Sequence, residues 1–171
     1  NLGFHTIAID GDKKAQGLTI SRESRVCDIK NSRELIKVAK EFQVNSITSF
    51  CTDIPMISIS EACEHLKLPC LTVKQAELSV NKYSQRSLLS KNEIRTPQYE
   101  KFDSPKEALN ALSKFVPPVV IKPVDSSGSR GVKFFDNFSK ITSDYLQEVI
   151  DLARSNTGII ESFIEGPELA V

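Results

Sequence analysis

One stretch decides the fold expected for this chain, Pro117-Pro118-Val119-Val120-Ile121-Lys122-Pro123-Val124-Asp125-Ser126-Ser127-Gly128-Ser129-Arg130-Gly131-Val132. Residues 119–121 are a β-branched run between prolines, which is typical of a strand with both faces covered. Lys122 ends this run, and residues 125–131 are small or polar apart from one arginine. Residues 132–135 then resume as a strand. The stretch therefore predicts a β-hairpin with a lysine beside its turn.

The turn of this hairpin has a composition that suits a phosphate group. Gly128 and Gly131 can adopt positive φ, so backbone N–H groups can lie close against a ligand. Those N–H groups and the point charge of Lys122 match phosphate oxygens. A surface hairpin with a flexible tip has the same composition and remains an alternative. The Walker pattern G-x-x-x-x-G-K-S/T is absent, because Lys122 precedes the glycines and no helix pattern follows them, and this disfavours a P-loop.

The composition is that of an ordinary globular protein. The chain has 171 residues, of which 40% are hydrophobic and 26% are charged, enough for one full core or two small ones. Lysine plus arginine equals aspartate plus glutamate at 22 each, so no net field attracts nucleic acid. No apolar run approaches the ~20 residues that span a bilayer, and a signal-peptide pattern is absent. We expect a cytoplasmic protein with no nucleic-acid or membrane partner.

The residues that most often bind metals are not grouped in metal-site patterns. The four cysteines have no C-x-x-C spacing and are expected to be buried free thiols: Cys27, Cys51, Cys63 and Cys70. His5 and His65 are far apart, and neither belongs to an H-x-x-x-H pair. The sequence therefore predicts that none of these cysteines and histidines binds a metal, and that both histidines have a structural or surface role.

The first half of the chain alternates strand and helix patterns. Strands are predicted at residues 4–10, 25–29, 46–51 and 70–73. Helices are predicted after Asn31, which has Glu34 three residues on, and over residues 54–66. This alternation indicates parallel βαβ units. Leu2-Gly3 is typical of a helix end, so we expect an earlier strand and helix to be missing from this domain.

A dinucleotide-binding module is an alternative for this first half. The alternation of strands and helices fits such a module, but no G-x-G-x-x-G turn is present in the sequence. The N-terminal turn that would carry it is the part expected to be missing. A nicotinamide-dependent oxidoreductase therefore remains open at this point.

The second half of the chain predicts a different architecture. A polar helix is predicted over residues 75–92 and is expected to link two domains. A strand is predicted over residues 98–102. Ser104, followed by proline and by Glu107, marks a helix start whose apolar stripe is expected to pack on the sheet that carries Lys122. A further helix is predicted over 143–153, and a strand over 159–164.

Two glutamates stand in unusual places near the end of the chain. Glu161 follows two isoleucines in a predicted buried strand, and Glu168 lies beyond a glycine and a proline. A buried carboxylate without a partner costs several kcal/mol, so Glu161 should be hydrogen-bonded, ion-paired or reserved for a ligand. A solvated position on an edge strand is the alternative for Glu161.

Together these elements resemble the ATP-grasp superfamily, in which a strand lysine and a glycine-rich hairpin close over the triphosphate of ATP. Lys122 and the hairpin occupy those positions, and Lys82 in Asn81-Lys82-Tyr83 resembles the second phosphate lysine. By resemblance Glu161 faces the adenine amino group, and Glu168 binds the ribose. The resemblance also implies that the backbone of Ser162 and Ile164 lies along the base edge. The hairpin residues implied to contact phosphate are Ser126, Ser127, Gly128, Ser129 and Gly131.

The resemblance covers essentially the whole chain and implies an α/β fold in two domains. Residues 1–80 would be an incomplete, parallel-sheet pre-ATP-grasp domain, and residues 81–171 a linker helix and the first α+β ATP-grasp subdomain. In the family the magnesium ligands lie well downstream of the adenine hinge. We therefore expect this segment alone to lack ligase turnover and to contain no catalytic or metal-binding residue of its own.

The implied activity is that of an ATP-dependent ligase. Such an enzyme joins a carboxylate to an amine or a thiol through an acyl phosphate, with ATP and Mg²⁺ as cofactors. The sequence does not name the carboxylate, and it leaves a homo-oligomer open. A noncatalytic nucleotide-binding domain, which would keep Lys122 and Glu161 but lack the magnesium ligands, is the remaining alternative.

Overall fold

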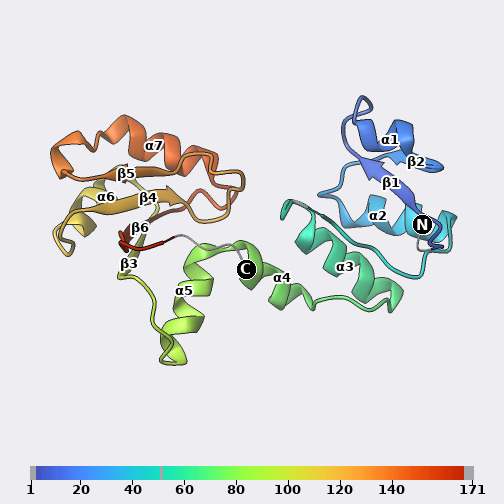
Figure 1. The fold of residues 1–171 in the computed structure, drawn as a ribbon, viewed down its shortest axis with the longest axis horizontal. Helices are drawn as coiled ribbons and strands as arrows, with labels where there is room; N and C mark the ends of the chain where they lie inside the picture. Colours follow the sequence, from blue (N-terminus) through green and yellow to red (C-terminus); the bar gives the residue numbers. More distant parts are fainter. Residues whose placement is uncertain (1–2, 51, 168–171) are drawn as a thin grey trace. The chain divides into compact units, whose positions relative to one another are not determined.

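A computed structural model provides the fold of this chain and describes residues 3–50 and 52–167 (Figure 1). The chain divides into two compact units, residues 1–77 and 78–171. The elements that begin in the first unit are β1 (Ile7–Asp10), α1 (Gln16–Ile20), β2 (Glu23–Val26), α2 (Ser32–Glu41), α3 (Met56–Leu66) and α4 (Val73–Val80). The second unit contains α5 (Lys82–Lys91), β3 (Tyr99–Phe102), α6 (Pro105–Leu112), β4 (Val119–Pro123), β5 (Lys133–Phe135), the short 3₁₀ helix η1 (Phe138–Lys140), α7 (Ser143–Leu152) and β6 (Gly158–Ser162).

The first unit contains a small parallel sheet. β1 and β2 pair in parallel from Ile7↔Glu23 to Asp10↔Val26, and α1 connects them. The predicted parallel pairing is confirmed, although the second strand lies earlier than residues 25–29. Helix α2 begins where predicted, because the side chain of Asn31 accepts a hydrogen bond from the Arg33 backbone N–H. Helices α2 and α3 pack around Leu35, Ile59 and Cys63.

Two predicted strands of the first unit are wrong. Residues 46–50 form no strand, and Cys51 lies outside the described residues. The residues predicted as a strand at 70–73 lead into α4 instead. Thr72 and Gln75 cap this helix reciprocally: the Gln75 side chain accepts from the Thr72 backbone N–H at 2.9 Å, and Thr72 Oγ1 accepts from the Gln75 N–H at 3.2 Å. A β-branched run becomes a strand only where another strand pairs with it, and this capping box favours the helix.

The single helix predicted over residues 75–92 is two helices. Asn81, between α4 and α5, has extended backbone angles, and its side chain accepts a hydrogen bond from the Ser84 N–H at 2.9 Å. Asparagine is among the best N-cap residues, so a new helix begins at Lys82. Lys82 and Arg86 are four residues apart in α5 and therefore lie on one face of this helix.

The second unit is built on an antiparallel sheet of four strands in the order β3-β6-β4-β5. Strands β4 and β5 form the predicted hairpin, with Val119 opposite Phe135 and Ile121 opposite Lys133. Strand β6 lies between β3 and β4, so it is a central strand. The alternative that placed Glu161 on a solvated edge is therefore wrong.

One face of this sheet carries the main core. The core includes Ala108 and Leu112 from α6, Leu146 from α7, and Val119 and Ile121 from β4. Figure 1 shows α7 lying alongside β4 and β5. The predicted start of α6 is confirmed by two hydrogen bonds at its N-terminus. Ser104 Oγ accepts from the Glu107 N–H, and the Glu107 carboxylate accepts from the Asp103 N–H. Helix α6 therefore packs on the sheet that carries Lys122, as predicted.

The cysteines only partly follow the prediction of buried thiols. Cys27 and Cys63 are free and buried, and burial raises the pKa of the Cys63 thiol to about 11. Cys70 is free but exposed, because it belongs to the loop before α4 rather than to a buried strand. Among residues 3–50 and 52–167, no three His, Cys, Asp or Glu side chains are grouped so that they could hold a metal ion. No helix in these ranges is long and apolar enough to cross a membrane.

Candidate functional site

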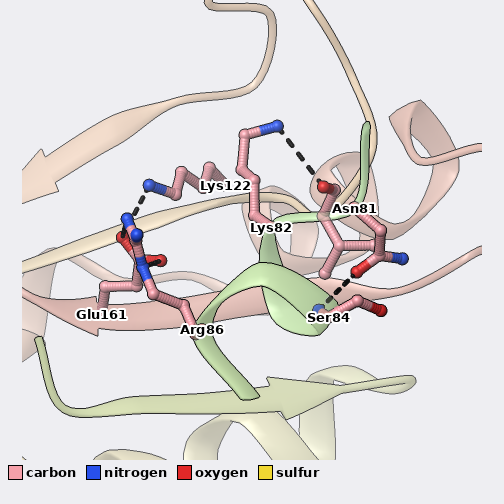
Figure 2. A network of polar contacts seen from close by, with 7 residues as sticks. Asn81, Lys82, Ser84, Arg86, Lys122 and Glu161 are labelled. Atoms are coloured by element: carbon pink, nitrogen blue, oxygen red, sulfur yellow. Dashed lines mark hydrogen bonds and ion pairs between the residues drawn. The ribbon is translucent and has the colours of Figure 1, made fainter. Parts of the chain in front are cut away.

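The carboxylate of Glu161 lies at the centre of a buried ion-pair network (Figure 2). Glu161 is only 4% exposed, although it is ionisable. Its Oε1 atom accepts a hydrogen bond from Arg86 Nε at 2.9 Å. Its Oε2 atom accepts from Lys122 Nζ at 2.6 Å and from Arg86 Nη2 at 3.4 Å. Both carboxylate oxygens are therefore bound by positively charged groups.

The strand register explains how Glu161 and Lys122 meet. Glu161 lies directly opposite Val120 of β4 and Tyr99 of β3. Residues opposite each other in a sheet share a face, and so do residues two apart in a strand. Lys122 therefore shares the face of Glu161, whereas the core residues Val119 and Ile121 point to the opposite face. Alternation along the strands thus separates the charged site from the main core.

Two opposing effects act on the Glu161 carboxyl group. Burial by itself raises its pKa, because the charged form loses hydration. Hydrogen bonds from Arg86 and then Lys122, together with their positive charges, lower the pKa, and their combined effect is larger. The pKa of Glu161 is therefore held below its ordinary value, and the group is a charged hydrogen-bond acceptor at neutral pH.

Lys82, the other lysine of the predicted site, contacts the base of the hairpin turn. Its Nζ donates to the Ser126 carbonyl oxygen at 2.9 Å and lies 3.4 Å from the Val124 carbonyl oxygen. Its backbone N–H donates to the same Val124 carbonyl at 2.8 Å. Figure 2 shows the Lys82 amino group directed away from the Glu161 carboxylate. The two predicted phosphate lysines thus lie beside the same hairpin but bind different groups in this structure.

The base of the hairpin turn is fixed, and its tip is exposed. The buried carboxylate of Asp125 accepts from the backbone N–H groups of Arg154 and Ser155 at 2.8 and 3.0 Å. The Arg154 guanidinium in turn donates to the Asp125 carbonyl oxygen. Residues 128–130 at the tip are exposed. A turn anchored at its base and open at its tip leaves backbone groups accessible to a ligand.

The two glycines of the turn have the backbone angles expected from the sequence. Gly128 has φ of 67° and Gly131 has φ of 72°, both in the left-handed region. Ser129 also adopts positive φ, at 56°. The Tyr145 hydroxyl lies within hydrogen-bonding distance of the carbonyl oxygens of Ile121 and Gly131, at 2.8 and 3.1 Å. Tyr145 therefore connects the end of the turn to β4.

An exposed aromatic pair lies on the same side of the sheet as the ion pairs. Phe134 is opposite Val120, so its side chain shares the face of Glu161 and Lys122. Its ring meets that of Phe163 edge to face, with centroids 4.9 Å apart. The two residues remain 52% and 44% exposed. This face therefore combines a charged cluster with an exposed apolar surface.

The other predicted site residues that the structure describes are not part of the ion pairs of Glu161. Ser162 ends β6, and its backbone N–H donates to the Gln98 carbonyl oxygen at 2.9 Å. Ile164 is exposed just after that strand. Ser127 accepts from Arg130 Nε through its carbonyl oxygen at 3.2 Å. Glu168, the predicted ribose ligand, lies outside the described residues. Their contact with a nucleotide stays a prediction.

Arg86 is the residue of this network that the sequence did not reveal. Arg86 is 75 positions before Glu161, and no short motif joins the two residues. The available signal was its spacing from Lys82, because residues four apart in a helix lie on one face. The same spacing holds in the continuous helix that the sequence predicts, but it does not show that this helix face lies against the strand that carries Glu161.

The second half of the chain, which holds this site, matches a known protein family. Residues 80–171, more than half of the chain, match the family described as phosphoribosylglycinamide synthetase, ATP-grasp (A) domain. The chain therefore belongs to that ATP-grasp family, and the resemblance seen in the sequence is confirmed.

The chain also has relatives at the level of the whole sequence. It is 30% identical over 171 residues to the formate-dependent phosphoribosylglycinamide formyltransferase of Francisella tularensis (strain SCHU S4 / Schu 4), covering 96% of this chain and 43% of that protein. The corresponding formyltransferase of Aliivibrio fischeri is 28% identical, with 96% of this chain and 42% of that protein covered. The chain thus spans less than half the length of these curated relatives.

Solved structures show the same fold at lower identity. The biotin carboxylase domain of the Hydrogenobacter thermophilus 2-oxoglutarate carboxylase, a dimer in complex with MgADP, ADP and bicarbonate, matches with a TM-score of 0.74 and 18% identity. This match covers 96% of the present chain and 40% of that chain. Phosphoribosylglycinamide synthetase from Anaerococcus prevotii matches with a TM-score of 0.59 and 23% identity, covering 96% and 41%. These likenesses support the predicted α/β fold with a parallel and an antiparallel sheet.

Proposed function

We propose that this chain is the ATP-binding portion of an ATP-dependent ligase that activates a carboxylate as an acyl phosphate and transfers it to an amine or a thiol. The observation that carries the proposal is the buried carboxylate of Glu161 paired with Lys122 beside the hairpin. Membership of the ATP-grasp family supports it. None of these observations supports the alternative of a nicotinamide-dependent oxidoreductase. The assignment of residues 1–80 as a pre-ATP-grasp domain belongs to the same proposal.

The side chains on the open face of the sheet fit the parts of an adenine nucleotide. Glu161 would accept a hydrogen bond from the adenine amino group, and the exposed rings of Phe134 and Phe163 would contact the base. Lys122 would donate to the phosphates without leaving Glu161 completely, because an ammonium group has three donors. Lys82 would reach the same phosphates by exchanging its carbonyl partners for phosphate oxygens.

The backbone would complete the nucleotide site. N–H groups of the turn over residues 126–131 would contact phosphate oxygens, since positive φ at Gly128 and Gly131 opens the turn to a ligand. The backbone of Ser162 and Ile164 would follow the edge of the base, and Glu168 would bind the ribose. Closure of the hairpin over the phosphates would exclude water from a reactive acyl phosphate.

Magnesium would accompany the nucleotide, as it does in the MgADP complex of the Hydrogenobacter thermophilus domain. When bound, the ion would neutralise charge on the phosphates. The part of the chain that the structure describes has no cluster of acidic, histidine or cysteine side chains for it, so we assign no magnesium ligand there. Stabilisation of phosphate charge by this chain would come from Lys82, Lys122 and the turn.

The carboxylate substrate can be searched for directly. The Francisella tularensis relative is formate-dependent by name, so formate is the first carboxylate to test, followed by a panel of amino and hydroxy acids. The measurement is release of ADP from ATP by the full protein with magnesium, an amine acceptor and each acid in turn. Release of ADP that depends on one acid supports the ligase proposal. ATP binding without acid-dependent release across the panel would favour the noncatalytic nucleotide-binding domain.

The nucleotide site itself is tested by Lys122→Ala. Charge-assisted hydrogen bonds contribute about 1.5 to 3 kcal/mol, so ATP affinity should fall about tenfold to a hundredfold. Isothermal titration calorimetry of the full protein with ATP and magnesium measures this loss. Lys106→Ala, which removes an exposed lysine from α6, is the matched control and should bind as the wild type does. Unchanged ATP affinity of Lys122→Ala with a normal circular dichroism spectrum would remove Lys122 from the site.

A further inference from the structure

Arg86 makes more contacts with the Glu161 carboxylate than Lys122 does. The Arg86 guanidinium reaches both carboxylate oxygens, with Nε at 2.9 Å from Oε1 and Nη2 at 3.4 Å from Oε2. Lys122 reaches Oε2 alone. An arginine that spans both oxygens of a carboxylate fixes the orientation of the carboxylate plane, whereas an ammonium group acts as a point charge. In this structure, therefore, Arg86 sets the direction of the Glu161 acceptor atoms.

The two cations also differ in what they would do when a nucleotide binds. This step rests on the proposed function, in which Lys122 contacts the phosphates. Any shift of Lys122 toward a phosphate weakens its hold on Glu161, and Arg86 on α5 is then the remaining cation at the carboxylate. Arg86 lies on a separate element, α5, whose start is set by the Asn81 cap. Its contact with Glu161 can thus persist while Lys122 moves.

We propose that Arg86 is a positioning residue that fixes the Glu161 carboxylate as a hydrogen-bond acceptor and thereby sets the preference of the site for adenine over guanine. Adenine presents an amino group as a donor, whereas guanine presents a carbonyl oxygen at the same position. A carboxylate fixed by Arg86 accepts a hydrogen bond from the adenine amino group and repels the guanine carbonyl oxygen. Arg86 itself touches no base in this scheme and acts through Glu161.

Loss of Arg86 would change the protonation of Glu161 as well as its orientation. The charged groups that contact this carboxylate are Arg86 from α5 and Lys122 from β4, and the residue paired with Glu161 on β3 is Tyr99. Without Arg86, burial would favour the neutral acid more strongly, and the pKa would rise. A protonated carboxyl can donate a hydrogen bond to the guanine carbonyl. The preference for ATP over GTP should therefore weaken further as pH falls.

The experiment compares the full protein in four forms: wild type, Arg86→Gln, Arg86→Lys and Lys91→Gln. The last variant removes one exposed positive charge from the end of the same helix and serves as the control. Affinities for ATP and GTP are measured by calorimetry with magnesium at pH 8 and pH 6, and the readout is their ratio. Circular dichroism spectra confirm that each variant is folded.

The wild type and Lys91→Gln should prefer ATP by tenfold or more at both pH values, as expected when a wrong base leaves a buried acid unpaired. For Arg86→Gln the ratio should fall about tenfold at pH 8 and further at pH 6. Arg86→Lys should lie between, since lysine keeps the charge but loses the contact with both oxygens. If Arg86→Gln fails to fold, Arg86→Lys carries the comparison. Ratios equal to the wild type at both pH values in a folded Arg86 variant would overturn the inference.

A second readout needs no nucleotide. Carbon-13 NMR titration of the Glu161 carboxyl, assigned through Glu161→Gln, should give a higher pKa in Arg86→Gln than in the wild type. Equal pKa values would overturn the inference, because Arg86 would then not control this carboxylate. Failure of the wild type to bind ATP would instead overturn the proposed function. The two failures are therefore distinguishable.

Discussion

At the scale of single residues, the site is determined by one buried acid and its two cations. The sequence predicted that Glu161 needs a partner, because a carboxylate after two buried isoleucines cannot remain unpaired at small cost. It also predicted a strand that ends at Lys122, whereas the pairing of this strand with the one that carries Glu161 is seen only in the structure. It could not predict Arg86, since the contact between Arg86 and Glu161 depends on how helix α5 lies over the sheet. Such a contact has no local sequence signature.

The ion pairs make a prediction for stability against pH. The pKa of Glu161 is lowered by folding, so its contribution is fully present above its ordinary value of 4.5 and is lost as pH falls below it. Glu161→Gln leaves two cations without their anion and should lower the free energy of unfolding by about 3 to 5 kcal/mol at pH 7. Urea denaturation should show this difference shrinking as pH is lowered from 5 to 3.

The exposed Glu148, which lies 3.9 Å from Lys133, provides the control for this measurement. Glu148→Gln should change stability by less than about 1 kcal/mol at either pH. A difference between wild type and Glu161→Gln that stays constant down to pH 3 would show that the charge of Glu161 does not stabilise the fold.

At the scale of elements, helix caps decided where predictions succeeded and where they failed. The helix start at Ser104 was predicted correctly, because proline and Glu107 follow this residue at the positions expected after an N-cap. The Thr72 cap was missed, since the β-branched residues around it also fit a strand. The strand predicted at 46–51 failed for a related reason, because apolar alternation cannot show whether a partner strand exists. Whether a segment becomes a strand depends both on its local sequence pattern and on the presence of a partner strand. Only the local pattern can be seen in the sequence.

The hairpin turn gives a prediction at this scale from its two glycines. Both have positive φ, but a Cβ atom at Gly131 would lie 2.8 Å from Leu152 Cδ1 and 3.0 Å from Pro123 Cγ, whereas one at Gly128 meets nothing within 4 Å. Gly128→Ala should therefore cost only backbone strain, about 1 kcal/mol. Gly131→Ala adds overpacking and should cost about 2 to 4 kcal/mol.

Thermal and urea unfolding of the two glycine variants measure this difference. Gly128→Ala is the matched control, because it introduces the same side chain in the same backbone region without a close neighbour. Equal losses of stability in both variants would mean that Leu152 and Pro123 move aside freely, and the turn would then be less firmly anchored than its contacts indicate.

At the scale of the whole molecule, the fold class followed from the alternation of elements and from the resemblance of four short segments to one superfamily. The family is confirmed over residues 80–171, the part of the chain that holds Lys82, Arg86, Lys122 and Glu161. The first unit was predicted less well, because two of its four expected strands do not form among the described residues. Short β-branched runs identify a strand poorly when the sheet they would join is small.

The central claim is that the face carrying Glu161 and Lys122 binds ATP, and a crystal structure of the full protein with a nonhydrolysable ATP analogue and magnesium tests it most directly. The account predicts the adenine amino group within about 3 Å of the Glu161 carboxylate, and phosphate oxygens at similar distances from the amino groups of Lys122 and Lys82. An analogue bound elsewhere, with the ion pairs of Glu161 unchanged and no phosphate at either lysine, would contradict it.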